Sequence, residues 1–110
     1  MKTKIPSIKV FVTSDSKRFL KEVLAGIEEE GVLYEVETRG DDSSVHLATM
    51  AAGESLLETG IGIDKEFASI TICKLPLNNP IQSFSCLNND KLRIAGSNAA
   101  RIIKGIPLKY

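Results

Sequence analysis

Few side chains in this sequence have both the type and the spacing that catalysis needs. The single histidine, His46, stands in a polar stretch that opens a short predicted helix. Cys73 and Cys86 fall in predicted strands at no metal-ligand spacing, so we interpret them as small buried apolar side chains. The GIG triplet at residues 60–62 lacks the other residues of a phosphate-binding loop. No serine, cysteine or lysine has a recognisable nucleophile context, and we therefore predict no catalytic residue.

The stretch AGIEEEG, residues 25–31, ends a predicted helix with three consecutive glutamates. Carboxylates in a last helical turn face the negative end of the helix dipole, at a cost of about 0.3–1 kcal/mol each, and they repel one another. Helix stability alone therefore does not favour three glutamates at this position. The helical period places Glu22, Ala25, Gly26 and Glu29 on one stripe that we expect to face outward. Two interpretations stay open: a solvated charge run, or a site where a carboxylate meets a cation or basic group of another molecule.

A second helix ending, GSNAARIIKGIP at residues 96–107, carries basic and small residues. Opposite its apolar stripe we expect Arg93, Ser97, Arg101 and Lys104, with Gly96 and Asn98 beside them. This face could be solvated, and a phosphate-binding role lacks aromatic support. Docking against an acidic protein surface is the favoured interpretation. The predicted partner-binding residues are therefore Glu22, Gly26, Glu28, Glu29, Glu30, Asn98, Arg101 and Lys104.

Length and composition bound the fold and its setting. The chain has 110 residues with 43% hydrophobic and 25% charged content, which suits one soluble domain over residues 1–110. The apolar patch at residues 8–12 is too short for a signal-peptide core, and no run approaches a membrane span, so we expect a cytoplasmic protein. The formal net charge is zero, which gives no general attraction to nucleic acid. Basic residues gather at residues 1–21 and 91–110 and acids at 28–42, which could orient a protein partner unless the fold interleaves these segments.

Apolar periodicity predicts an element order of βαβαβββα, that is, a compact α/β domain with a mixed sheet of about five strands flanked by helices. Ser14 or Asp15 is the expected N-cap of the first helix, and Gly105 and Pro107 end the last one. A hairpin turn is expected at residues 64–66, and Lys74–Pro80 should be irregular. The expected strands are Ser7–Thr13, Val32–Thr38, Thr59–Asp64, Phe67–Cys73 and Ile81–Leu87, and the expected helices are Ser16–Glu30, Val45–Ala52 and one from about Leu92 to Gly105.

The motifs GIEEEG and GSNAARIIKGIP closely resemble the small subunit of the diol/glycerol dehydratase reactivating factor. GIGID at residues 60–64 and the spacing of Leu75, Pro76 and Pro80 are also similar. The resemblance extends over most of the chain at matching length and is weak from Gly40 to Glu58.

This resemblance implies an anticodon-binding-domain-like fold, similar to the dehydratase medium subunit, and a non-catalytic chain. It implies an α2β2 assembly with a large chaperone-like ATPase subunit, which would hold ATP or ADP and Mg²⁺. The complex would remove damaged cobalamin from the inactivated dehydratase, as the small subunit exchanges places with the medium subunit and contacts the dehydratase large subunit transiently. The resemblance further implies that Glu29 reaches an interface Mg²⁺, and that this chain alone binds no cofactor. Association with a bacterial microcompartment and preference for glycerol or 1,2-propanediol stay open.

Two other classes of protein remain as alternatives. One is a true medium subunit of the dehydratase, although we expect 110 residues to be too few for the extra cobalamin-contacting segments of such subunits. The other is a small anticodon-binding-like module that contacts RNA, against which the zero net charge argues. Self-association of the isolated chain is expected if the outward helix stripes are apolar.

Overall fold

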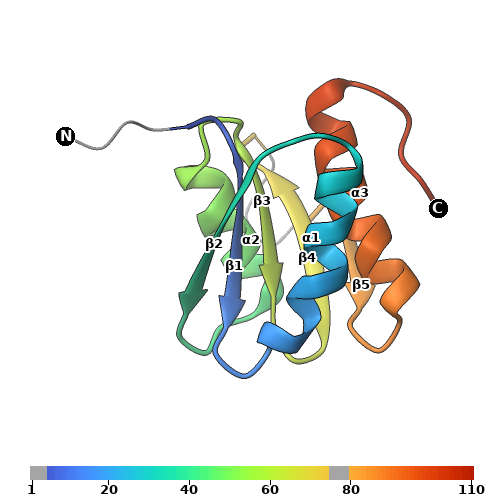
Figure 1. Ribbon diagram of the computed structural model, residues 1–110. Helices are drawn as coiled ribbons and strands as arrows, with labels where there is room; N and C mark the ends of the chain where they lie inside the picture. Colours follow the sequence, from blue (N-terminus) through green and yellow to red (C-terminus); the bar gives the residue numbers. More distant parts are fainter. Residues whose placement is uncertain (1–4, 75–79) are drawn as a thin grey trace.

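A five-stranded mixed sheet forms the centre of the computed structural model, which describes residues 5–74 and 80–110. The strands lie in the order β2-β1-β3-β4-β5, with β1 parallel to both β2 and β3, and β4 antiparallel to β3 and β5 (Figure 1). The strands are β1 (Ile8–Thr13), β2 (Tyr34–Arg39), β3 (Thr59–Ile63), β4 (Phe67–Ile72) and β5 (Gln82–Ser85).

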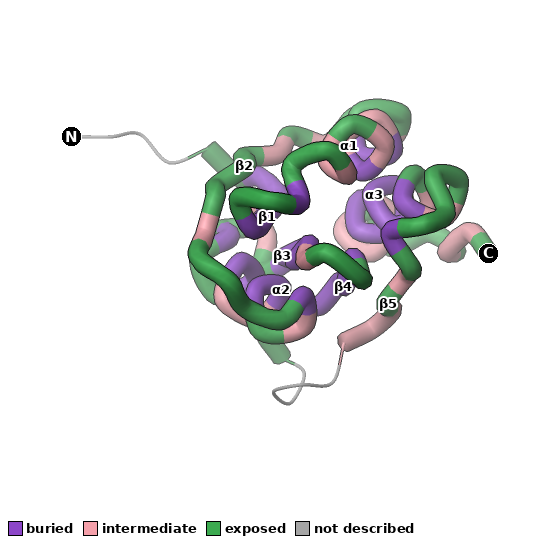
Figure 2. Tube along the Cα trace, turned by 90° about the horizontal axis from the view of Figure 1, so that it is seen from below, coloured by how far each residue is buried: buried purple, intermediate pink, exposed green. Residues whose placement is uncertain are grey.

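Helices cover both faces of the sheet, which gives three layers (Figure 2). The helices α1 (Leu20–Glu29) and α3 (Asn89–Lys104) lie together on one face, and α2 (Ser44–Glu54) lies on the other. A short 3-10 turn, η1 (Lys17–Phe19), leads into α1. Because β2 and β3 lie on opposite sides of β1, the two parallel crossovers place their helices on opposite faces of the sheet.

Alternation along the strands divides the core into two parts. Val10 of β1 and Ile61 of β3 pack under α1 and α3 in the larger cluster, whereas Phe11 packs with Leu47 of α2 in the smaller one. On the α2 side β3 presents glycine: a Cβ at Gly60 would lie 2.8 Å from the backbone carbon of Ala51. The glycines of this strand therefore let α2 rest directly on the backbone of β3.

The predicted element order and fold class are confirmed, and several details differ. Neither Ser14 nor Asp15 caps the first helix: η1 begins after Ser16 without a side-chain cap, and the Asp15 carboxylate accepts a hydrogen bond from the Thr13 hydroxyl instead. Cys73 is exposed, contrary to its predicted burial, whereas Cys86 is buried as expected. The irregular segment expected at Lys74–Pro80, with Leu75 and Pro76, lies mostly outside the described residues.

The last helix is capped at both ends, and it ends at Gly105 as predicted. The Asn88 side chain accepts a hydrogen bond from the backbone N–H of Lys91, and Gly105 adopts the left-handed conformation at the C-terminal end with a φ of 68°. The backbone N–H of Ile106 then bonds the carbonyl of Arg101, which reverses the chain sharply after α3. No helix in the described part of the chain is long and apolar enough to cross a membrane.

Candidate partner-binding surface

The two helix-end motifs meet each other where α1 crosses α3. Gly26 is buried against α3, where an added Cβ would lie 2.7 Å from the backbone nitrogen of Ser97. Gly96 faces α1 in the same way, with an added Cβ 2.9 Å from the carbonyl carbon of Val23. These distances leave no room for a methyl group on either helix. The prediction that Gly26 lies on an outward stripe is therefore wrong, because its missing side chain lets the two helix backbones touch.

This close crossing brings the glutamate run against the basic residues of α3. The Glu30 carboxylate accepts hydrogen bonds from the Ser97 hydroxyl at 2.6 Å, Arg101 Nε at 2.9 Å and Lys104 Nζ at 3.1 Å. Lys104 also donates to the backbone carbonyl of Glu30 at 2.9 Å, and so satisfies an acceptor at the end of α1. Only 8% of the Glu30 side chain is exposed.

These donors stabilise the charged form of Glu30. The Ser97 hydroxyl, then Lys104 and Arg101, lower the pKa of the Glu30 carboxyl to about 2, against the smaller opposing effect of burial. A carboxylate with this pKa stays ionised through the physiological range, so Glu30 acts as a fixed negative charge between the two helices.

The other glutamates of α1 are paired less tightly and are more open to solvent. Glu29 accepts a hydrogen bond from Arg93 Nε at 2.5 Å, and 44% of its side chain is exposed. Glu22 approaches the same guanidinium at 3.9 Å, whereas Glu28 accepts from the Tyr34 hydroxyl at 2.7 Å. We refer to Glu22, Glu29, Glu30, Arg93, Arg101 and Lys104 as the α1–α3 charge cluster.

The cluster corrects the predicted orientation of α3. Arg93, Ser97, Arg101 and Lys104 face α1 of the same chain, so the acidic surface they meet is the chain's own glutamate run. The fold thus interleaves the acidic and basic segments whose separation in sequence suggested a steered partner. A signal in the sequence could have shown this, since both motifs contain a glycine suited to a close helix crossing, beside charges of opposite sign.

Asn98 is likewise placed inside the chain. Its side chain is fully buried and bonds Gln82 and the backbone of Lys109. Of the eight predicted partner-binding residues, Gly26 and Asn98 are thus enclosed and Glu30 is nearly so. Glu28 and Glu29 are the carboxylates of the run that remain most open to another molecule.

An Mg²⁺ shared with a partner would suit Glu29 better than Glu30. Mg²⁺ prefers oxygen ligands and commonly takes only one or two carboxylates from a protein. Within residues 5–74 and 80–110, no three His, Cys, Asp or Glu side chains are placed to hold one metal ion. Glu29 could therefore supply one ligand to an ion whose remaining ligands come from water, a nucleotide or another chain.

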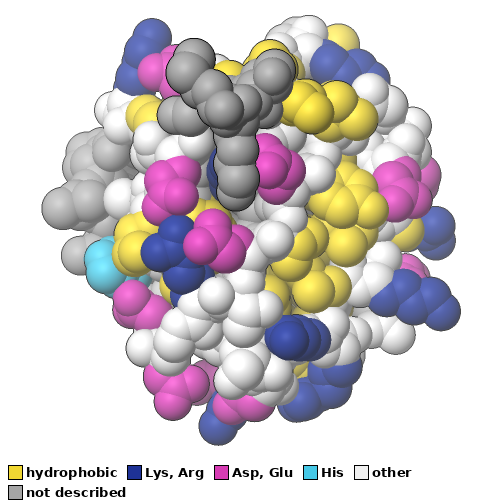
Figure 3. Space-filling model, turned by 60° about the vertical axis from the view of Figure 1, so that its left-hand side comes forward, with side chains coloured by type: hydrophobic (Ala, Val, Ile, Leu, Met, Phe, Trp, Pro, Cys, Tyr) yellow, Lys and Arg dark blue, Asp and Glu magenta, His cyan; other side chains and the backbone are white. Residues whose placement is uncertain are grey.

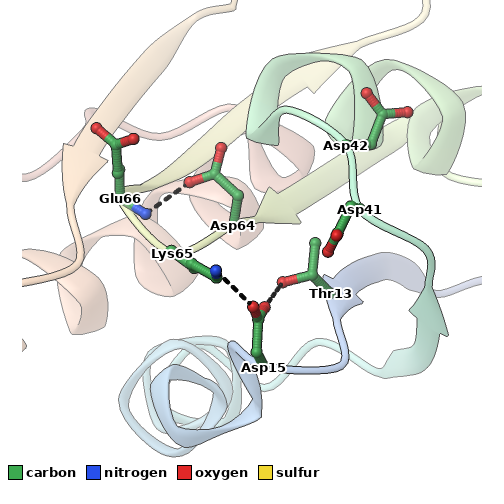
Figure 4. Close-up of a pocket in the computed structure, with 7 residues that line it drawn as sticks. All are labelled: Thr13, Asp15, Asp41, Asp42, Asp64, Lys65 and Glu66. Atoms are coloured by element: carbon green, nitrogen blue, oxygen red, sulfur yellow. Dashed lines mark hydrogen bonds and ion pairs between the residues drawn. The ribbon is translucent and has the colours of Figure 1, made fainter.

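An acidic hollow of about 250 Å³, which no sequence pattern indicated, lies at the carboxyl ends of β1 and β3 (Figure 4). Open α/β sheets often bind ligands at this position. Here, however, the carboxylates hold loops: Asp64 accepts from the backbone N–H groups of Ser44 and Phe67, and Asp15 pairs with Lys65 at 3.0 Å. The lone histidine pairs with Asp42 at the rim. The side chains drawn in Figure 4 do not converge on one point, so the hollow shows no ligand site.

No exposed large hydrophobic side chain lies within α1 or α3, whereas some lie at or near the β2 edge of the sheet. With this side turned forward, Figure 3 shows a band of hydrophobic surface between charged groups. Leu33 is 61% exposed, and Ile5 and Val36 are exposed as well. The apolar helix stripes on which self-association was expected are absent from the α1–α3 surface, which is charged.

Comparisons with known proteins agree with this architecture. The family model described as dehydratase medium subunit matches residues 5–109. The propanediol dehydratase-reactivating factor small subunit of Citrobacter freundii is 34% identical over 105 residues, which cover 94% of this chain and 90% of that protein. A solved structure of diol dehydratase-reactivating factor complexed with ADP and Mg²⁺ contains a chain that is 31% identical and superposes with a TM-score of 0.92, covering 97% of this chain and 100% of that one.

A glycerol dehydratase reactivase structure gives a similar result, with 27% identity, a TM-score of 0.91 and coverage of 96% of this chain and 98% of that one. The resemblance to reactivating-factor small subunits that the helix-end motifs predicted is confirmed. The chain belongs to the dehydratase medium subunit family.

Proposed function

We propose that this chain is the non-catalytic small subunit of a reactivating factor for an adenosylcobalamin-dependent diol or glycerol dehydratase. The observation that carries the proposal is the match to a chain of a diol dehydratase-reactivating factor, which spans 100% of that chain at a TM-score of 0.92. A match over the full length of the relative leaves no major element of that chain without a counterpart here.

In this proposal the chain works by binding, within an α2β2 assembly. Its larger partner subunit carries the ATPase domain and holds ATP or ADP with Mg²⁺. The rim of the α1–α3 charge cluster, where Glu22 and Glu29 lie beside Arg93, offers charged groups to that partner, as does the neighbouring exposed Glu28. Glu29 supplies an oxygen ligand to an Mg²⁺ at the subunit interface.

Subunit exchange would then release damaged cobalamin from the inactivated dehydratase. A chain that shares the fold of the dehydratase medium subunit can occupy the same place on the dehydratase large subunit, so the two compete. Exchange proceeds in one direction only if the nucleotide state of the larger partner changes its affinity for this chain, because a ligand shifts an equilibrium by its differential binding. The cytoplasm, or a bacterial microcompartment within it, is the setting for this activity.

The experiment is co-purification of this chain with a tagged reactivase large subunit in Mg²⁺, with ADP and with ATP. A stable complex whose affinity differs between the two nucleotides is the expected result. If neither nucleotide supports a complex, this chain is not the small subunit of that factor.

The description of the matching family keeps a second candidate open, a medium subunit of the dehydratase itself. Such a subunit contributes to the cobalamin site. Cobalamin titrated onto the isolated chain, and onto the chain mixed with a dehydratase large subunit, separates the two functions. Binding of cobalamin that depends on this chain would favour the medium-subunit function.

A further inference from the structure

Residues 106–110 fold back onto α3 after the left-handed turn at Gly105. In Figure 1 this last part of the chain leaves the top of α3 and runs down beside the helix. It forms no helix or strand. Its hold on the domain therefore depends largely on two side chains of α3, Asn98 and Arg101.

Asn98 contacts this segment through both atoms of its amide group. Its Oδ1 accepts a hydrogen bond from the backbone N–H of Lys109 at 2.7 Å, and its Nδ2 donates to the carbonyl of the same residue at 2.9 Å. The second Nδ2 hydrogen is donated to Gln82 Oε1 at 2.9 Å, which fixes the orientation of the amide. A fully buried amide is stable only with such partners, so Asn98 depends on the segment as the segment depends on it.

Arg101 makes a further contact of the same kind. Its Nη1 donates to the carbonyl of Pro107 at 2.8 Å, while its Nε donates to Glu30 at 2.9 Å. The same guanidinium therefore belongs to the α1–α3 charge cluster and to the hold on the segment. A molecule that binds at the charge cluster would lie next to residues 106–110.

The domain holds this segment mainly by its backbone. Besides the Ile106 N–H, which bonds the Arg101 carbonyl at the turn, the bonded backbone groups are the carbonyl of Pro107 and the N–H and carbonyl of Lys109. Side chains add less: Tyr110 is 93% exposed, Ile106 is 38% exposed, and Lys109 Nζ lies 3.8 Å from Glu30. Every residue except proline presents the same N–H and C=O pair, so these contacts do not require the sequence that now occupies them.

We propose that Asn98, whose amide is oriented by Gln82, and Arg101 form a binding site for a peptide backbone, which we call the backbone slot. Residues 107–109 occupy the slot within the chain, and an extended segment of the larger subunit takes their place in the complex. The second half of this proposal, in which a segment of the larger subunit replaces residues 107–109 (the exchange part), rests on the function proposed above. The internal segment has the advantage of a short tether, which gives it an effective concentration of about millimolar. A subunit docked at the charge cluster would hold its own segment at a similar local concentration and could compete.

The binding part can be tested on the full-length chain without a partner. The variant Lys109→Pro removes the N–H that donates to Asn98 Oδ1. The other residues of the segment are unchanged, but the segment is held less tightly in the slot. We expect a peptide of sequence IPLKY with blocked ends to bind this variant at least about tenfold more tightly than the unmodified chain, since the internal competitor is weakened. Shifts of the side-chain amide resonances of Asn98 in a peptide titration report binding directly.

Two further variants make the result specific to the slot. Lys109→Ala keeps the N–H and removes only the lysine side chain, so it should resemble the unmodified chain. Adding Asn98→Ala to Lys109→Pro should abolish peptide binding. Thermal unfolding of this double variant is the control that checks whether it is folded. If the peptide fails to bind Lys109→Pro at millimolar concentration, or binds the double variant equally well, the backbone slot is wrong.

The exchange part is tested with the large subunit. Lys109→Pro should assemble roughly three- to tenfold more tightly than Lys109→Ala, because the partner no longer has to displace a well-held segment. Equal affinities would show that the partner does not use the slot, even where the peptide binds. Failure of every variant and of the unmodified chain to assemble would overturn the proposed function, and the peptide result would still decide the slot.

Discussion

Glu30 at the end of α1 and Arg101 in the last turns of α3 share a 2.9 Å hydrogen bond although 71 positions separate them in the sequence. This contact joins the two motifs by which the family is recognised. Each motif contributes a glycine to the helix crossing and charged groups of one sign to the cluster beside it. The motifs thus primarily form the two sides of one helix–helix contact. Only the charged side chains exposed at the edge of this contact are available to a partner.

The glycine at the crossing gives the first prediction. Gly96→Ala would force its methyl group against the backbone of α1 and should destabilise the fold by about 1–3 kcal/mol or more, because backbone cannot yield as a flexible side chain can. Gly53→Ala is the matched control: it lies within α2 with no atom within 4 Å of the added Cβ, and should stabilise by about 0.5–1 kcal/mol. Urea unfolding of both variants measures the difference, and equal stabilities would show that the helices do not cross this closely.

The low pKa of Glu30 predicts how stability depends on pH. The pKa of this carboxyl is about 2 in the folded chain against an ordinary 4.5, chiefly because of the Ser97 hydroxyl, then Lys104 and Arg101. The folded chain therefore holds the carboxylate more strongly than the unfolded chain does. Its contribution is present in full above about pH 4.5 and is lost as the pH falls through 2.

The substitution Glu30→Gln should remove this dependence of folding stability on pH. The variant should be less stable than the unmodified chain at neutral pH by about 1–3 kcal/mol, since the charged donors of α3 lose their acceptor, and the difference should shrink below pH 4. Glu28→Gln is the control, because Glu28 bonds the Tyr34 hydroxyl rather than α3. The measurement is the unfolding midpoint in urea from pH 2 to 7. Parallel profiles for Glu30→Gln and the unmodified chain would contradict the assignment.

Apolar periodicity was sufficient to predict the element order, because each strand and helix carries its pattern locally. The strand predicted at Thr59–Asp64 is β3, where glycines alternate with isoleucines and the glycines let α2 approach closely. The exposure of Cys73 could not be predicted in this way, because it depends on where β4 ends at the sheet and on what covers that end.

The candidate surface was identified by its residues and misplaced in space. Periodicity divides a helix into an apolar and a polar face, but does not show whether the polar face meets solvent, a partner or another helix of the chain. Gly26 was expected on an outward stripe as a partner-binding residue, whereas in the structure α3 packs directly against it. Asn98 was placed beside the basic stripe of the last helix, opposite the core. In the structure it is buried and bonds residues 106–110, whose fold-back no local pattern predicts.

The proposed role of Glu29 predicts an effect on assembly and none on the isolated fold. Glu29→Gln should weaken binding to the large subunit in Mg²⁺ by roughly tenfold, the change that about 1.4 kcal/mol of binding energy gives. The thermal stability of the isolated chain should change little, because the Glu29–Arg93 pair is solvent-exposed and such pairs contribute about 0–1 kcal/mol. Titration calorimetry with and without Mg²⁺ separates a metal effect from a charge effect. Unchanged affinity in Mg²⁺ would remove Glu29 from the interface, and a matching loss for Glu28→Gln would assign the effect to general charge.

The two cysteines should differ in reactivity although neither forms a disulfide. Cys86 is buried, and burial, with Asp64 nearby, raises the pKa of its thiol to about 11, so very little thiolate forms at neutral pH. Cys73 is exposed, and the pKa of its thiol is raised as well, by partial burial and Glu58. A thiol reagent at pH 8 should therefore modify only Cys73, and slowly, in the folded chain. In urea it should modify both cysteines quickly. Cys73→Ser should remove the reaction of the folded chain and Cys86→Ala should leave it intact. Two equally reactive thiols in the folded protein would show that the end of β4 and the loop after β5 are packed differently from this structure.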